Sequence, residues 1–184
     1  MGFILTKVFT IHIKIQVEFA LTHDTKTAVL TLTGPANVWF GLGFGGSSMN
    51  DKPYAIIVDG NGNVTERKLA NHGPGTQLNT SIVVVSNIVK ENVRILELHR
   101  PVKGLSKDHF SLPTKPGDLN MISAVGDSIQ LAYHKTRTSG SVTLLPTKNK
   151  ACVCQPNTKD YITYMNSTTQ SFSVYDCLDE PRYR

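Results

Sequence analysis

Apolar and polar side chains alternate strictly from Ile11 to Phe19. An alternation with a period of two places the two kinds of side chain on opposite faces of an extended chain, so it indicates a half-buried β-strand. No window of the chain sustains the period of 3.6 that marks an amphipathic helix. Nine further stretches have the length and composition of strands: 26–33, 37–44, 54–59, 62–69, 80–86, 92–100, 119–125, 128–134 and 140–145.

Turn-forming residues separate these stretches, as at His72-Gly-Pro-Gly75, and the clearest example is Asp59-Gly60-Asn61-Gly62. Such a cluster between two strands is typical of a hairpin loop. About ten short strands at regular spacing favour an antiparallel β-sandwich or barrel. Because 40% of the 184 residues are hydrophobic, the chain can bury the core of one ordinary domain.

The composition changes after Pro146, and this change predicts the domain boundaries. We expect an N-terminal extension over residues 1–10, a β domain over 11–146 and a polar tail or linker over 147–184. The tail holds all the cysteines, namely Cys152, Cys154 and Cys177. An odd number leaves the pairing open, either as one disulfide with a free thiol or as a bond to a residue outside this sequence.

The formal net charge is +5, but the basic residues form no dense block. This pattern favours a solvated basic surface over a nucleic-acid interface. No apolar run approaches the length of about 18 residues that a transmembrane helix requires. The N-terminus does not resemble a signal peptide. Asn-x-Ser/Thr sequences at Asn63, Asn79 and Asn166 would accept glycans if the chain is exported.

The glycine-rich segment Gly41-Leu-Gly-Phe-Gly-Gly46 literally satisfies the dinucleotide-binding pattern. That pattern requires a following helix, whose N-terminus holds the pyrophosphate. Here Pro53 stands where the helix should be established, so we interpret the glycines as positions that admit close approach of another group. The sequence also lacks a nucleophile elbow and any His-x-His or His-x-x-x-His pair, so hydrolase and copper or zinc chemistry are disfavoured.

Two residues combine into a recognisable chemistry. Met49 lies in a polar loop after the glycine-rich strand, and His134 ends the predicted strand 128–134, on one face with Gln130 and Ala132. A thioether and an imidazole are a common axial pair for haem iron. By residue type alone, surface or packing roles are the more common explanation for each of them.

An ordered set of motifs resembles a known family. These motifs are Val38-Trp-Phe-Gly-Leu-Gly-Phe44, the Met49 loop, Tyr54-Ala-Ile-Ile-Val-Asp59, Leu98-His-Arg-Pro101 and Tyr133-His-Lys-Thr-Arg137. Over roughly residues 12–146 they are similar to the DOMON domain. The resemblance implies an immunoglobulin-like antiparallel β-sandwich, usually extracellular or lumenal, that binds haem or sugar.

One branch of that family holds b-type haem without a covalent bond. The resemblance to this branch implies that Met49 and His134 are the axial ligands, since they stand where its Met and His stand. If Met49 proves exposed, His72 or His99 is our second choice of partner for His134. The other residues implied are Trp39, Phe40 and Phe44 near the porphyrin, where core packing is the equal alternative, and Tyr133, Lys135 and Arg137 near the propionates.

The resemblance implies a one-electron carrier rather than an enzyme with its own catalytic activity. In relatives the electron partner is a flavin dehydrogenase or a transmembrane cytochrome b, and neither is encoded in these residues. We therefore expect one extracellular module, or one on the extracytoplasmic side of a membrane. The alternatives are a non-haem DOMON module that binds carbohydrate or protein, and an accessory domain of a copper monooxygenase-like protein.

Overall fold

A computed structural model describes residues 7–12, 15–21, 26–114 and 117–144. All of them belong to one compact unit, Met1–Thr147. The predicted tail, residues 147–184, lies outside the described residues, so its three cysteines and the glycosylation sequence at Asn166 remain predictions. No helix in the described part of the chain is long and apolar enough to cross a membrane.

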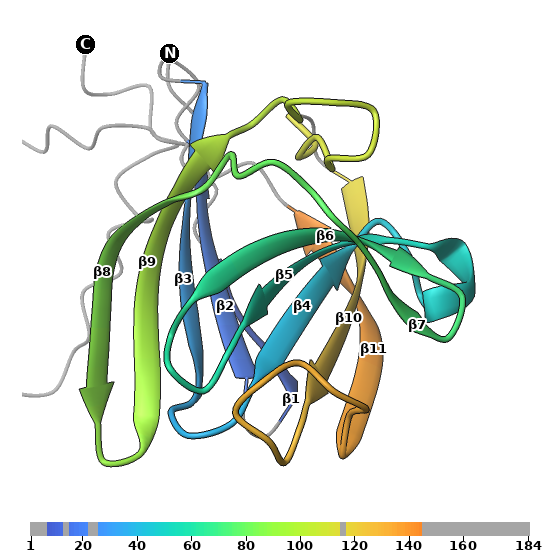
Figure 1. Ribbon diagram of the computed structural model, residues 1–184. Coiled ribbons are helices and arrows are strands. Elements are labelled where there is room, and N and C mark those ends of the chain that lie inside the picture. The colour runs from blue at the N-terminus through green and yellow to red at the C-terminus, as the bar shows by residue number, and fades with distance from the viewer. Residues whose placement is uncertain (1–6, 13–14, 22–25, 115–116, 145–184) are drawn as a thin grey trace, which may run out of the picture. The chain divides into compact units, whose positions relative to one another are not determined.

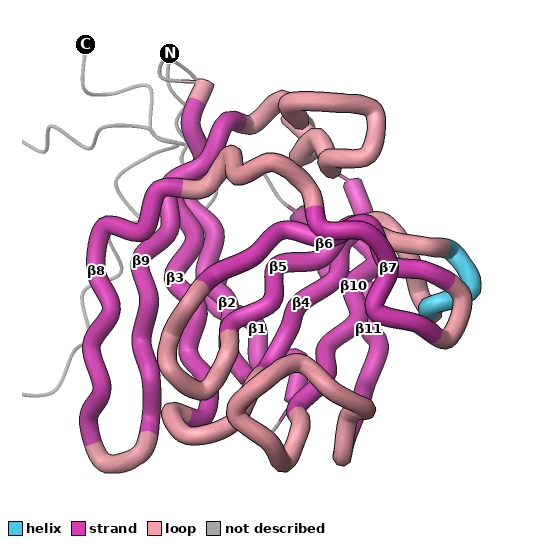
Figure 2. The backbone as a smooth tube through the Cα atoms, viewed as in Figure 1, coloured by secondary structure: helices cyan, strands magenta, loops and turns pink. Residues whose placement is uncertain are grey.

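The described chain is a sandwich of two antiparallel sheets (Figure 1). One sheet has the order β1-β2-β3-β9-β8 and the other β11-β10-β4-β5-β6-β7. The one helical element among the described residues is the short 3₁₀ helix η1, and strands and loops make up the rest of that trace (Figure 2). The predicted all-β sandwich is confirmed. The elements are β1 (Lys7–His12), β2 (Ile15–Leu21), β3 (Thr27–Pro35), β4 (Phe40–Phe44), η1 (Met49–Asp51), β5 (Tyr54–Val58), β6 (Val64–Ala70), β7 (Gly73–Gln77), β8 (Val83–Lys90), β9 (Val93–Pro101), β10 (Gly117–Val125) and β11 (Thr136–Leu144).

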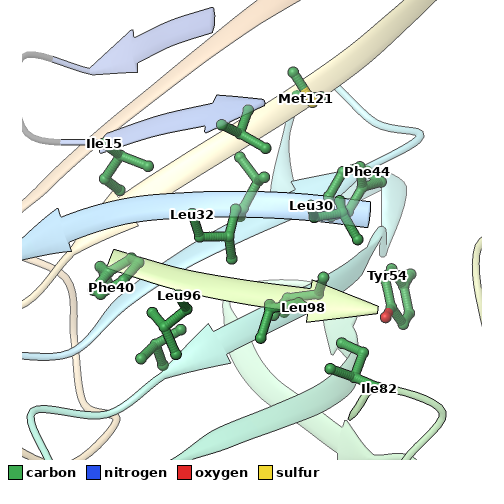
Figure 3. Packing of buried hydrophobic residues seen from close by; sticks show 14 of the residues in the cluster. Ile15, Leu30, Leu32, Phe40, Phe44, Tyr54, Ile82, Leu96, Leu98 and Met121 are labelled. Atoms are coloured by element: carbon green, nitrogen blue, oxygen red, sulfur yellow. The ribbon is translucent and has the colours of Figure 1, made fainter. Parts of the chain in front are cut away.

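The main core lies between the two sheets (Figure 3). Strands β3, β9 and β10 bury every second side chain, as the alternation predicts. Sheet one supplies residues such as Leu30, Leu32 and Leu96, and sheet two supplies residues such as Phe40 and Met121, all of them at most 1% exposed. The inner face of each sheet is therefore committed to holding the fold together.

The alternation from Ile11 to Phe19 is not one strand. The chain reverses between His12 and Ile15, and β1 pairs antiparallel with β2. The predicted extension over residues 1–10 thus contains the start of β1, which begins at Lys7. With this hairpin and β7, the described residues form eleven strands rather than about ten.

Two further predictions of local structure are wrong. Residues 128–134 form a bent loop between β10 and β11, not a strand, so Gln130, Ala132 and His134 do not share a strand face. Conversely, the segment 73–77, which looked like a turn because of Gly73, Pro74 and Gly75, forms the edge strand β7. An edge strand tolerates proline because one side of its backbone has no partner strand.

A buried carboxylate stabilises the segment in which the chain crosses from one sheet to the other. Glu66 on β6 is 1% exposed and accepts hydrogen bonds from the Tyr54 hydroxyl at 2.5 Å, from the Ser81 hydroxyl at 2.7 Å and from the Ile82 N–H at 3.2 Å. It also accepts the N–H of Ser81. Burial and the neighbouring carboxylate raise the pKa of the Tyr54 hydroxyl. Glu66 thereby fixes the segment that carries the chain from β7 to β8.

Candidate functional site

Strands β4 and β5 are buried on both faces. Their inner side chains, such as Phe40, Leu42 and Ile56, belong to the main core. On the outer face of the same sheet, a second apolar cluster is formed by Trp39, Ala55 and Ile57, with Leu69, Ala124 and Leu131 packed against it. An outer sheet face that is shielded from solvent must be covered by other parts of the chain, and here loops such as 126–135 cover it.

A cavity of about 720 Å³ lies on this outer face. Its volume falls within the roughly 300–1,000 Å³ that is usual for small-molecule and cofactor sites. The floor comes from β4, β5 and β10, and the walls come from the loop 45–53, the β6–β7 turn and the loop 126–135. The lining residues include Trp39, Gly41, Gly43, Met49, Ala55, Ile57, Leu69, His72, Ile122, Ala124, Leu131, Tyr133, His134 and Arg137.

Two glycines of β4 shape the floor. A Cβ atom on Gly41 would lie 2.5 Å from Cδ1 of Ile57, and one on Gly43 would lie 2.7 Å from Cγ1 of Ile122. The side chains of the two isoleucines therefore lie flat across the neighbouring strand. The result is a low apolar floor, which suits a planar hydrophobic group.

Met49 is presented by a turn that is held by Asp51. The carboxylate of Asp51 accepts the N–H of Ser47 at 2.8 Å and the N–H of Ser48 at 3.0 Å. These two backbone hydrogen bonds lower the pKa of Asp51. The Lys52 N–H closes the turn on the Met49 carbonyl at 3.0 Å. Met49 is half-buried, as a side chain on a cavity wall should be.

His134 lies on the loop 126–135, which backbone hydrogen bonds fasten at three places. The Trp39 N–H donates to the Ser128 carbonyl at 2.9 Å, and the Lys135 N–H donates to the Val125 carbonyl at 2.8 Å. The Gly60 N–H donates to the Ile129 carbonyl at 2.8 Å. Between these anchors the chain passes over the outer face, so the half-buried His134 is held at the cavity.

Strand register shows that the two loops come from opposite ends of the sheet. Met121 pairs with Phe44, and Val125 pairs with Phe40. The loop after Val125 therefore leaves at the Phe40 end, whereas the Met49 loop follows Phe44 at the other end. Because both loops line one cavity, a ligand in it would lie between Met49 and His134.

The polar groups at the cavity favour an acceptor-bearing or anionic ligand. Arg137 is the one permanently charged residue among the described lining residues, and none of these is Asp or Glu. Tyr133 stands at the rim, 83% exposed, with its ring centroid 4.6 Å from that of His134. The indole of Trp39 is 3% exposed, and its N–H has no hydrogen-bond partner among the described residues. A buried donor without a partner costs about 1–3 kcal/mol.

Solved structures share this architecture, although no known family and no curated protein matches the sequence. The cytochrome b domain of pyranose dehydrogenase from Coprinopsis cinerea aligns over 70% of this chain and 76% of its own, with a TM-score of 0.55 and 13% identity. The cytochrome domain of Myriococcum thermophilum cellobiose dehydrogenase aligns over 90% and 91%, with a TM-score of 0.50 and 15% identity. The chain shares their fold. The predicted resemblance is thus confirmed at the level of the fold.

The structure brings together five of the eight residues predicted for the site, and Phe40, Phe44 and Lys135 do not line the cavity. Trp39, Met49, Tyr133, His134 and Arg137 all line the cavity. Their roles toward a cofactor remain predictions.

Phe44 does not line the cavity, so of its two predicted roles the structure shows core packing. It lies on the inner face of β4 with Phe40, in the main core, where its ring stacks on that of Phe110 at 6.0 Å. The alternation of β4 explains this, because the aromatic residues take one face and the glycines take the other.

The sequence did not single out Ile57, Ile122 or Leu131 for the cavity wall. Of the two second-choice histidines, His72 lines the cavity and His99 does not. His99 lies on β9 in the other sheet, where its imidazole contacts the Glu97 carboxylate at 2.8 Å. No group of three or more His, Cys, Asp or Glu side chains in the described residues could hold a metal ion.

Proposed function

We propose that this chain is a b-type haem-binding domain that carries single electrons, with Met49 and His134 as the axial ligands. The observation that carries the proposal is the cavity itself, because it brings a thioether and an imidazole from opposite ends of one sheet over a flat apolar floor. A thioether–imidazole pair is an established ligand set for haem iron. The shared fold with two cytochrome domains supports it.

The residues of the cavity fit this group. The floor of Gly41, Gly43, Ile57 and Ile122 offers apolar contact to a planar macrocycle. Arg137 offers a positive charge to a propionate. Tyr133 lies at the exposed rim of the cavity, where it would contact the propionate end of the haem, as Arg137 would.

The chain's own groups determine the reaction class. When bound, haem b supplies an iron that gains and loses one electron. Met49 and His134 would both hold the iron through protein side chains, which favours electron transfer over binding of oxygen or a substrate at the metal.

The partner would be a protein that delivers or accepts single electrons. The two cytochrome domains with this fold belong to pyranose and cellobiose dehydrogenases. By analogy we propose a flavin dehydrogenase or a transmembrane cytochrome b as the partner, and an extracellular or extracytoplasmic location. Asn63 and Asn79 are exposed, as glycan acceptors would be.

Haem reconstitution tests the proposal. The full chain is mixed with haemin, and spectra of the oxidised and reduced forms are recorded for the wild type, Met49→Ala and His134→Ala. We expect low-spin bands in the wild type, loss of the methionine-to-iron absorption in Met49→Ala and loss of the low-spin form in His134→Ala.

Two variants serve as matched controls. Met121→Leu changes a methionine of the main core, and His99→Ala changes a histidine of the other sheet. Both should keep the wild-type spectrum. Unchanged spectra in the Met49 and His134 variants would refute the ligand assignment, and a wild type that takes up no haem would favour a non-haem binding module.

A further inference from the structure

Three side chains with a nitrogen or sulfur lone pair suited to iron line the cavity, not two. They are Met49, His72 and His134. His72 lies in the turn between β6 and β7, next to the turn that carries Met49. The Leu69 N–H at the end of β6 donates to the carbonyl of Pro53, at the end of the Met49 loop, at 3.0 Å.

Register places His72 at the Met49 end of the sheet. Tyr54 pairs with Lys68, so the turn after Ala70 lies at the end where β5 begins and where the Met49 loop finishes. Arg67 braces the hairpin, because its side chain donates to the Pro74 carbonyl at 2.7 Å and to the Gly75 carbonyl at 3.2 Å. Met49 and His72 thus approach the cavity from one end, and His134 approaches from the other.

The imidazole of His72 is available for binding. The rings of His99 and His109 are occupied by Glu97 and by Ser106 and the Asn79 carbonyl, respectively. Those of His72 and His134 make no hydrogen bond or ion pair with any described residue. Of His72, His99, His109 and His134, the two with free imidazoles are therefore the two that line the cavity.

The backbone of His72 has a φ of +56°, in the left-handed region that glycine adopts most readily and that Asn, Asp and His adopt more often than other residues. A glycine at this position would therefore keep the turn while it removes the imidazole.

We propose that His72 is a second ligand donor on the Met49 side, so that the cavity can hold haem iron through His134 together with either Met49 or His72. The inference rests on the proposed function. Because methionine ligation raises the reduction potential of haem iron relative to imidazole ligation, exchange of Met49 for His72 would lower it. The residues at this end of the sheet would then set the potential.

The test compares Met49→Ala with the double variant Met49→Ala/His72→Gly after haem reconstitution of the full chain. Glycine adopts a positive φ without strain, so the second change removes the imidazole and favours the turn. We expect Met49→Ala to remain low-spin with a lower reduction potential, and the double variant to lose the low-spin form. Added imidazole should restore it in the double variant, which shows that the pocket is intact.

A matched control is Met49→Ala/His99→Ala, which should behave like Met49→Ala alone. The inference is overturned if Met49→Ala is already high-spin, or if the double variant with His72→Gly remains low-spin. A wild type that binds no haem would instead overturn the proposed function, so the two failures are distinguishable.

Discussion

Replacement of Gly126 by alanine should disturb the loop that carries His134. A Cβ atom at this position would lie within 2.5 Å of Nε1, Cδ1 and Cε2 of Trp39, which are rigid ring atoms that cannot bend away. Overpacking of this kind costs about 1–3 kcal/mol. If the loop moves instead, it weakens the 2.9 Å bonds from the Gly126 N–H to Trp39 and from the Trp39 N–H to Ser128, each worth about 0.5–1.5 kcal/mol.

We therefore expect Gly126→Ala to lower the free energy of unfolding by about 1–4 kcal/mol. Urea unfolding followed by fluorescence measures it directly, because Trp39 is the chain's one tryptophan. Haemin titration should also show weaker uptake, since His134 shares the displaced loop. Gly140→Ala, in the next strand, is the matched control: nothing lies within 4 Å of its Cβ position, so it should be neutral or slightly stabilising. Equal stability of the two variants would refute the steric argument.

Two further predictions concern polar anchors. Glu66→Leu leaves the N–H groups of Ser81 and Ile82 without an acceptor, so it should lower the free energy of unfolding in urea by roughly 2–6 kcal/mol. Glu66→Gln keeps an acceptor for both N–H groups and should lower it by about 1–2 kcal/mol. Equal losses of stability in the two variants would contradict this. Burial is the largest single effect on Asp59 and raises its pKa, but the hydrogen bonds from Asn63 and from the N–H groups of Asn61 and Gly62 together outweigh burial and lower the pKa below its ordinary value. The stabilisation by Asp59 should thus be complete above pH 4 and fade as the pH falls below it; a stability difference between wild type and Asp59→Asn that is flat down to pH 2 would oppose this.

The fold was predictable because most strands are buried on one face only. Leu30, Leu32 and Leu96 follow the period of two, and turn residues such as Gly60 separate the strands. The hairpin between β1 and β2 left no signal, since Ile13 and Lys14 continue the alternation and neither is a turn former. The loop 126–135 looked like a strand because Leu131 is apolar for a different reason, namely that it covers the outer cluster.

The candidate site was predictable only in part. Met49 and His134 are distinctive residue types in a matching order, but periodicity does not show that their loops leave opposite ends of the sheet and turn back over it. Ala55-Ile-Ile-Val58 carries a usable signal, because a strand without alternation is apolar on both faces and needs a cover on each. The alternation within β4 favours core packing for Phe44, because it shares a face with Phe40 and the glycines take the other face.

The two faces of the sheet that contains β4 and β5 have different roles, and this affects which substitutions such a domain can accept. Residues such as Leu42 and Ile56 hold the sandwich together from inside, whereas Ile57 and Leu131 build the cavity from outside. Substitutions on the outer face can therefore reshape, empty or repurpose the cavity while the folded scaffold survives. A sandwich built on this plan can acquire a new ligand by evolution or design through changes in three loops and a few outward side chains.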